Sequence, residues 1–269
     1  MKKSFIITSL AVAIVLTASV LPAQVDPAPY ITIHYDRIDP AQTSGWVENG
    51  KAWVKAFQEA KAGEEHYWRG YQSGFTYAWV SDMPNYGYMD DSEARNKALN
   101  EKLGEGTMDE LEAGGQAAIV EHYNEIWKYQ ADMSYFPEGF SPAGMKAANV
   151  SIDSIKPGKG GDFRELVKEA VAAMKTIEAP VNFFAYSIPF GKGSYGFVSW
   201  AEDRAALHGG PDFGELLAEA LGPEAAQGLF KRYLASVSAT EETDWRARPD
   251  LSYVSDEPME KKAMEEATE

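Results

Sequence analysis

The chain has 269 residues, and its 41 acidic side chains against 25 lysines and arginines give a formal net charge of −16. So acidic a surface repels phosphate backbones and anionic lipid headgroups, so we expect neither a nucleic acid nor a membrane surface as the partner. The chain has no cysteine, which excludes disulfides, thiolate nucleophiles and cysteine-ligated metals.

Residues 1–23 have the features of a secretory signal peptide. Lys2 and Lys3 provide the positive start, residues 5–20 are largely apolar, and Ala23 suits a cleavage site. We therefore expect a cleaved signal, no stable membrane anchor after cleavage, and a periplasmic or secreted mature protein. An uncleaved anchor is the alternative, but the apolar run is slightly short for a full membrane span.

Hydrophobic periodicity predicts alternating strands and helices through the rest of the first half. In chain order these are a strand at residues 31–35, a helix at 46–57, strands at 67–72 and 75–81, helical segments at 92–103 and 107–126, and a strand containing Trp127. The second half follows the same order, with a strand at residues 150–155, a helix at 163–174, strands at 181–188 and 194–200, helices that begin near Asp212 and Pro223, and a strand containing Trp245.

The second half also repeats short segments of the first. Residues 127–135 and 245–253 share the pattern W-x-x-x-x-D-[ML]-S-Y at an offset of 118 residues. Residues 76–81 (TYAWVS) and 194–199 (SYGFVS) match at the same offset. Two matches at one offset indicate a tandem duplication. Because the W-x-x-x-x-D-[ML]-S-Y residues persist in both copies, we expect them to maintain the fold.

The repeat divides the chain into segments. We predict a signal peptide at 1–23, a first unit at 24–136, a linker at 137–147, a second unit at 148–254 and an acidic tail at 255–269.

Each unit has the order β-α-β-β-α(α)-β, which is typical of the ferredoxin-like fold. The chain resembles the dimeric α+β barrel superfamily in fused form, on the repeat, the element order and the aromatic strands of residues 30–254. The resemblance implies an α+β protein in which two ferredoxin-like sheets pack face to face as a pseudo-dimeric barrel. Such a chain is expected to be a monomer or a homodimer.

The first strand carries the main catalytic candidates. We expect Ile33 and Tyr35 to lie under the helices and His34 and Asp36 to face the barrel interior, although the opposite register would exchange the faces. His34 could be a general base or an axial haem ligand, with Asp36 as its partner. Ser151 replaces His34 in the second copy, as expected if only one half is active.

The third strand of each unit is rich in aromatic residues. Because Ala78 and Gly196 suit close packing by a helix, we expect the residues beside them to point into the barrel. These ligand-binding candidates are Tyr77, Trp79, Tyr195 and Phe197. They either fill the interior or wall a chamber for a flat or apolar ligand.

We predict no metal site and no cofactor, with haem the one cofactor that the resemblance allows. His122 and Glu125 are one turn apart in the predicted helix at 107–126, but a metal site needs three or four ligands.

Three functions stay open at this point. The first is binding of a small apolar or aromatic molecule in a barrel chamber. The second, implied by the resemblance, is a cofactor-free or haem-dependent monooxygenase or isomerase. The third is a structural or interaction protein with a solid barrel. An open pocket with His34 at its wall would favour the enzyme.

Overall fold

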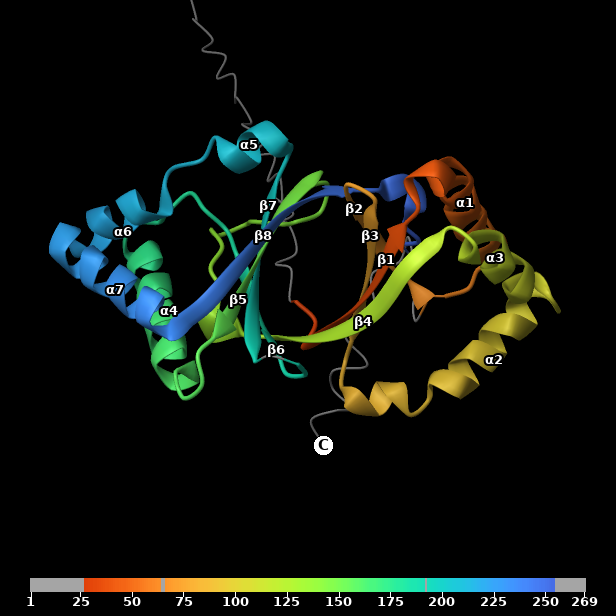
Figure 1. Cartoon of the computed structure of the whole chain (residues 1–269), viewed down its shortest axis with the longest axis horizontal. Helices are drawn as coiled ribbons and strands as arrows, with labels where there is room; N and C mark the ends of the chain where they lie inside the picture. Colours follow the sequence, from red (N-terminus) through yellow and green to blue (C-terminus); the bar gives the residue numbers. More distant parts are fainter. Residues whose placement is uncertain (1–26, 64–65, 192, 255–269) are drawn as a thin grey trace, which may run out of the picture.

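Eight antiparallel strands close into one barrel, with a group of helices on each of two opposite sides (Figure 1). The computed structural model describes residues 27–63, 66–191 and 193–254, so the predicted signal peptide and acidic tail lie outside the described residues. Around the barrel the strands follow the order β1-β3-β2-β8-β5-β7-β6-β4. The predicted α+β class and pseudo-dimeric barrel are confirmed.

The first unit contributes four neighbouring strands in the order β4-β1-β3-β2. Its elements are β1 (Tyr30–Ile38), α1 (Thr43–Ala60), β2 (Arg69–Ser73), β3 (Thr76–Met83), α2 (Ser92–Leu103), α3 (Thr107–Gln116) and β4 (Ile119–Tyr129). Short 3-10 turns lie at Pro40–Gln42, Tyr86–Met89 and Ala131–Met133.

The second unit repeats this arrangement in the order β8-β5-β7-β6. Its elements are β5 (Ala147–Ile155), α4 (Gly160–Thr176), β6 (Phe184–Ile188), β7 (Ser194–Ala201), α5 (Arg204–His208), α6 (Phe213–Leu221), α7 (Pro223–Ser236) and β8 (Val237–Ala247), followed by a 3-10 turn at Pro249–Leu251. The long strands β4 and β8 reach across to β6 and β2 of the opposite unit and so close the barrel. Among the described helices, none is long and apolar enough to cross a membrane.

The predicted helix at 107–126 is wrong in its second half. The helix ends at Gln116, and residues 119–129 form β4, which pairs with β1 along its length. Gly114 and Gly115 weaken a helix at this point, and tertiary pairing with β1 overrides the helical propensity of the acidic residues that follow. The predicted spacing of His122 and Glu125 on one helix face is therefore also wrong, because residues three apart in a strand point to opposite faces.

The predicted facing of β1 is wrong as well. Ile33 and Tyr35 belong to the cluster inside the barrel, whereas His34 and Asp36 line a pocket on the outer face, below the helices of the first unit. The physical reason is that both sheets share the interior, so it takes the apolar side of each strand. The alternative register considered above is the one that the protein adopts.

The four aromatic ligand-binding candidates of β3 and β7 follow the same rule and point outward. Tyr77 and Trp79 contact Trp46 of α1, with ring centroids 4.3 and 5.6 Å away. Tyr195 and Phe197 contact Phe163 of α4 in the same way, at 5.1 and 6.2 Å. The expectation that these four side chains line the barrel interior is wrong.

Gly196 faces the barrel interior, where the ring of Trp127 packs against it in place of the expected helix. A β-carbon at Gly196 would overlap the indole of Trp127, which is 1% exposed. The repeated tryptophan of the first unit is thus buried between the two sheets.

The repeated D-[ML]-S-Y residues hold the two units together. Ser134 Oγ accepts a hydrogen bond from the backbone N–H of Ala185 at 2.9 Å and donates one to the carbonyl of Gln130 at 2.8 Å. Ser252 Oγ makes the same two bonds, with the N–H of Gly70 and the carbonyl of Arg248. Each serine therefore joins the end of one unit to a strand of the other, in agreement with a role in the fold.

Candidate functional site

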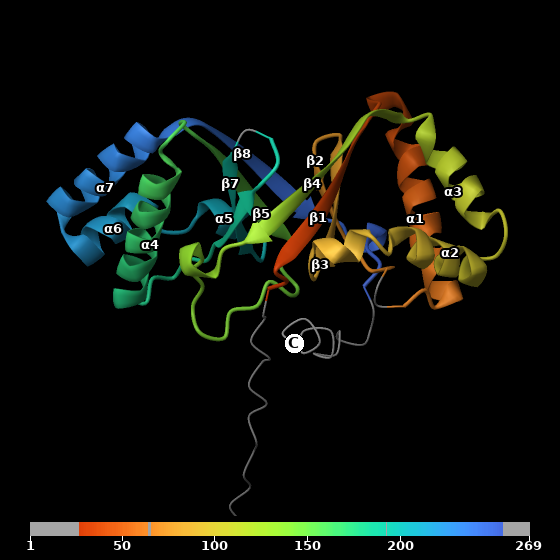
Figure 2. The same ribbon diagram turned by 90° about the horizontal axis from the view of Figure 1, so that it is seen from below.

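A pocket of about 640 Å³ lies between the outer face of the first unit's sheet and its helices. Figure 2 shows α1, α2 and α3 on one side of the barrel, with β1, β3 and β4 beside them. The volume is in the range of small-molecule sites, which are mostly apolar with a few placed polar groups. The aromatic lining consists of Trp46, Trp53, Phe57, Trp68 and Trp79.

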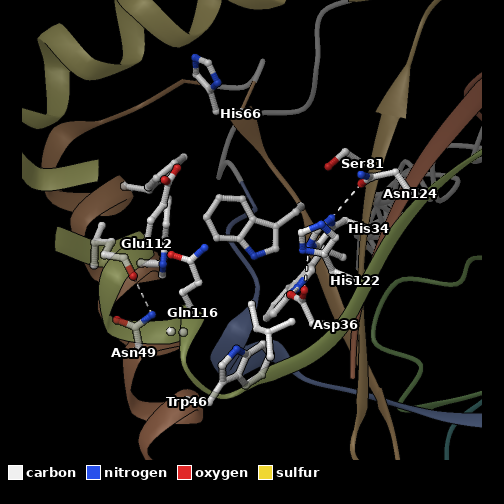
Figure 3. A pocket seen from close by; sticks show the side chains of 18 of the residues that line it. His34, Asp36, Trp46, Asn49, His66, Ser81, Glu112, Gln116, His122 and Asn124 are labelled. Carbon is white, nitrogen blue, oxygen red and sulfur yellow. Dashed lines mark hydrogen bonds and ion pairs between the residues drawn. The ribbon is translucent and has the colours of Figure 1, made fainter. Parts of the chain in front are cut away.

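His34 and Asp36 form a bonded pair on the strand side of this pocket (Figure 3). Residues two apart in a strand share a face, and His34 Nε2 lies 2.9 Å from Asp36 Oδ1. The other carboxylate oxygen, Asp36 Oδ2, accepts the indole N–H of Trp79 at 2.9 Å. His34 Nδ1 lies 2.8 Å from Asn124 Oδ1. The chain Trp79–Asp36–His34–Asn124 thus crosses three neighbouring strands and orients the imidazole.

The environment of this pair favours a charged histidine. The hydrogen bond to Asp36 raises the pKa of His34 above 6.5, and burial, which lowers it, is the smaller influence. The Asp36 side chain is 7% exposed and that of His34 is 37% exposed. A ligand can therefore reach the imidazole, while the carboxylate behind it stays shielded from water.

His122 adds a second imidazole to the same wall. It lies opposite Asp36 in the pairing of β1 with β4, and its ring centroid is 5.9 Å from that of His34. Two imidazoles at this distance can both contact one small polar group placed between them. In the described part of the chain, no three potential histidine, aspartate or glutamate ligands come together as a metal site.

The helix side of the pocket carries Asn49, Glu112 and Gln116 (Figure 3). Asn49 Nδ2 donates to the backbone carbonyl of Leu111 at 3.0 Å, which ties α1 to α3. Gly115 is buried beside it, and a β-carbon there would lie 2.9 Å from Asn49 Nδ2. The glycine thus lets α3 approach α1 without placing a side chain in the pocket.

The structure brings only part of the predicted set together. His34, Asp36 and Trp79 line the pocket, while Tyr77 is buried behind Trp46. Tyr195 and Phe197 belong to the packed core of the second unit.

Sequence reasoning missed several pocket residues. The sequence predicts a helix as far as residue 126, and this prediction does not place Asn124 and His122 beside His34. The Gly114-Gly115 pair was the available signal that the helix ends early.

Haem would need partners that this pocket does not offer. His34 with Asp36 has the arrangement of an axial histidine oriented by a carboxylate. The two propionates of haem, however, are usually met by cationic groups, and none of the described residues that line the pocket is a lysine or arginine. Glu112 adds a negative charge at the wall. The residues that line this pocket therefore do not fit haem.

Comparison with known proteins identifies the fold. No family model matches the chain. No curated protein matches it either. Among solved structures, a candidate monooxygenase from Lactobacillus acidophilus NCFM is 9% identical, with a TM-score of 0.50 over 84% of this chain and 96% of that one. A chlorite dismutase from Candidatus Nitrospira defluvii is 13% identical, with a TM-score of 0.46 over 82% and 91%. At 9% identity, the likeness to the first of these structures shows a shared fold and no activity.

Proposed function

We propose that the first unit is an enzyme site that binds a small, flat aromatic molecule and exchanges a proton with it through His34. The observation that carries this proposal is the His34–Asp36 pair at the wall of an open, aromatic pocket. A purely structural barrel would have no need of a histidine–aspartate pair on the outer face of one unit and not of the other.

The hydrogen bonds assign a role to each atom. Asp36 accepts the Nε2–H of His34 and so leaves Nδ1 as the atom that takes or gives the proton. Asn124, which is exposed, holds Nδ1 until a ligand hydroxyl takes its place. In the neutral form of His34, which keeps its proton on Nε2, the hydroxyl proton can move to Nδ1, and the resulting imidazolium is stabilised by the Asp36 carboxylate. Trp79 keeps that carboxylate in position.

This chemistry agrees with the enzyme hypothesis and restricts the reaction to one that begins with a proton transfer. Removal of a proton from an acidic O–H or C–H group is the step that an isomerase or a cofactor-free oxygenase would need first. The aromatic walls suit a planar ring, which they can contact by stacked or edge-to-face packing.

The test compares 1-naphthol with naphthalene, which lacks the hydroxyl, by calorimetric titration of the intact chain. We expect His34→Ala to weaken 1-naphthol binding by about tenfold or more, the value of one hydrogen bond to a charged group, and to leave naphthalene binding unchanged. Asp36→Asn should have a similar but smaller effect, because the imidazole remains.

A matched control is available in the second unit. His208 Nε2 lies 2.7 Å from Asp244 Oδ2, and neither residue lines the pocket. His208→Ala should therefore leave 1-naphthol binding unchanged. Equal binding of 1-naphthol by the wild type and His34→Ala would overturn the proposal, and so would a Soret band with added haem that His34→Ala abolishes.

A further inference from the structure

A second cavity, of about 450 Å³, occupies the interior of the barrel. Inward side chains from all eight strands line it, and none of its residues lines the helix-covered pocket. The two cavities use opposite faces of β1: Ile31 and Ile33 face the barrel, while Thr32 and His34 face the pocket. An eight-stranded barrel is wide enough either to be filled by side chains or to hold one small ligand.

The interior is open because the two units do not pack in the same way. Gly196 lets the indole of Trp127 lie against β7. The 118-residue offset maps Trp127 onto Trp245 and Ala78 onto Gly196, so the approach to Trp245 that corresponds to Gly196 carries the methyl group of Ala78. Trp127 is 1% exposed, whereas Trp245 is only partly buried, and Trp245 and Ala78 both line the cavity. The methyl group of Ala78 thus occupies the space that Trp245 would need in order to pack as closely as Trp127 does.

The walls of this cavity suit a hydrocarbon. Isoleucine and valine side chains of β1, β3, β5 and β7 alternate with rings, among them Tyr71, Phe184, Tyr186, Trp200 and Trp245. The charged groups form a pair, since Arg69 Nη1 lies 4.0 Å from Asp82 Oδ1. Arg69 is 49% exposed and Asp82 23% exposed, so this pair lies toward solvent. Because the two charges balance, the cavity does not select an ion.

We propose that the barrel interior is a second ligand site, which takes a neutral, largely hydrocarbon molecule with one polar end directed to Arg69 and Asp82. The inference is independent of the acid–base function of the pocket, because the two sites share no lining residue.

The test uses N-phenyl-1-naphthylamine, a neutral fluorescent probe, with the intact chain. The probe's fluorescence rises when it enters an apolar cavity, and the variants below distinguish the barrel from the pocket. Val150→Phe places a ring in the cavity and should weaken probe binding by at least tenfold. Val80→Phe fills it from the opposite unit, so a folding defect in one variant leaves the other to decide.

A variant that fills the other cavity separates the two sites. Gly115→Tyr with Asn49→Leu should abolish 1-naphthol binding in the pocket and leave the barrel probe unaffected. Probe binding that survives both valine variants, or that is lost in the Gly115→Tyr/Asn49→Leu protein, would overturn the barrel site. Neither result would alter the pocket proposal, which depends on His34→Ala.

Discussion

The two units have the same fold but differ in what lies between sheet and helices. In the second unit, Tyr233 of α7 reaches down to the sheet, and its hydroxyl donates to Asp153 Oδ1 at 2.7 Å. The 118-residue offset pairs Tyr233 with Gly115 of the first unit. The pocket therefore opens where the helical cover lacks a ring, and the sheet below did not have to change its pairing to form it.

The buried carboxylate is common to both units, and the histidine is not. Asp153 corresponds to Asp36, and burial raises the pKa of Asp153 while its bonds to Tyr233 and Thr240 lower it in part. His34 corresponds to Ser151. The structural aspartate therefore has a histidine partner only in the unit whose helical cover lacks the tyrosine.

The largest expected effect is on stability, and it comes from truncating the aromatic residue that each unit's first helix packs against its sheet. Phe163 is fully buried at the position that corresponds to Trp46, which borders the pocket. Phe163→Ala should lower the free energy of unfolding by about 3–5 kcal/mol, and Trp46→Ala by less, because part of its ring is not packed. Chemical denaturation measures both. Equal losses would show that the first unit is packed as tightly as the second.

In the barrel interior, the larger loss of stability is expected in the first unit and not in the second. Trp127→Ala removes a fully buried indole and should cost about 3–5 kcal/mol, whereas Trp245→Ala should cost less because that ring is only partly buried. The same denaturation measurement applies, with Gly196→Ala as a second probe of the Trp127 contact. If both tryptophan variants unfold like the parent, neither ring is part of the core.

The two serines should give a smaller and equal effect. Ser134→Ala and Ser252→Ala each leave one backbone N–H without its acceptor, that of Ala185 or of Gly70. Each should cost about 1–3 kcal/mol. Unequal losses, measured by thermal and chemical unfolding, would show that the symmetry of the hydrogen bonds does not extend to their energies.

The smallest expected effect is a dependence of stability on pH. The folded pKa of His34 is raised, so its contribution is complete below the unfolded value of 6.5 and is lost as the pH rises through the raised pKa. The difference in unfolding free energy between the wild type and His34→Ala should therefore shrink from about pH 5 to about pH 9. Ser151→Ala serves as the control at the corresponding position and should show no such trend.

The sequence predicted the repeat, the order of elements and the closeness of His34 to Asp36, because these follow from spacing along one chain. The facing of β1 could not be predicted, since Ile33 and His34 alternate and either face could have met the helices. The role of Gly115 in opening the pocket could not be predicted either, because it becomes clear only when Tyr233 is seen to occupy the equivalent space in the second unit.

The exchange of terminal segments between the units has a consequence for folding. Tyr135 and Phe183 exchange backbone hydrogen bonds across the junction, and Trp68 donates to the carbonyl of Tyr253 at the other one. Each half therefore completes its partner and has unpaired edges when alone. We expect the barrel to unfold in a single cooperative transition, and the linker between the halves to act by keeping the two interlocking parts at high effective concentration.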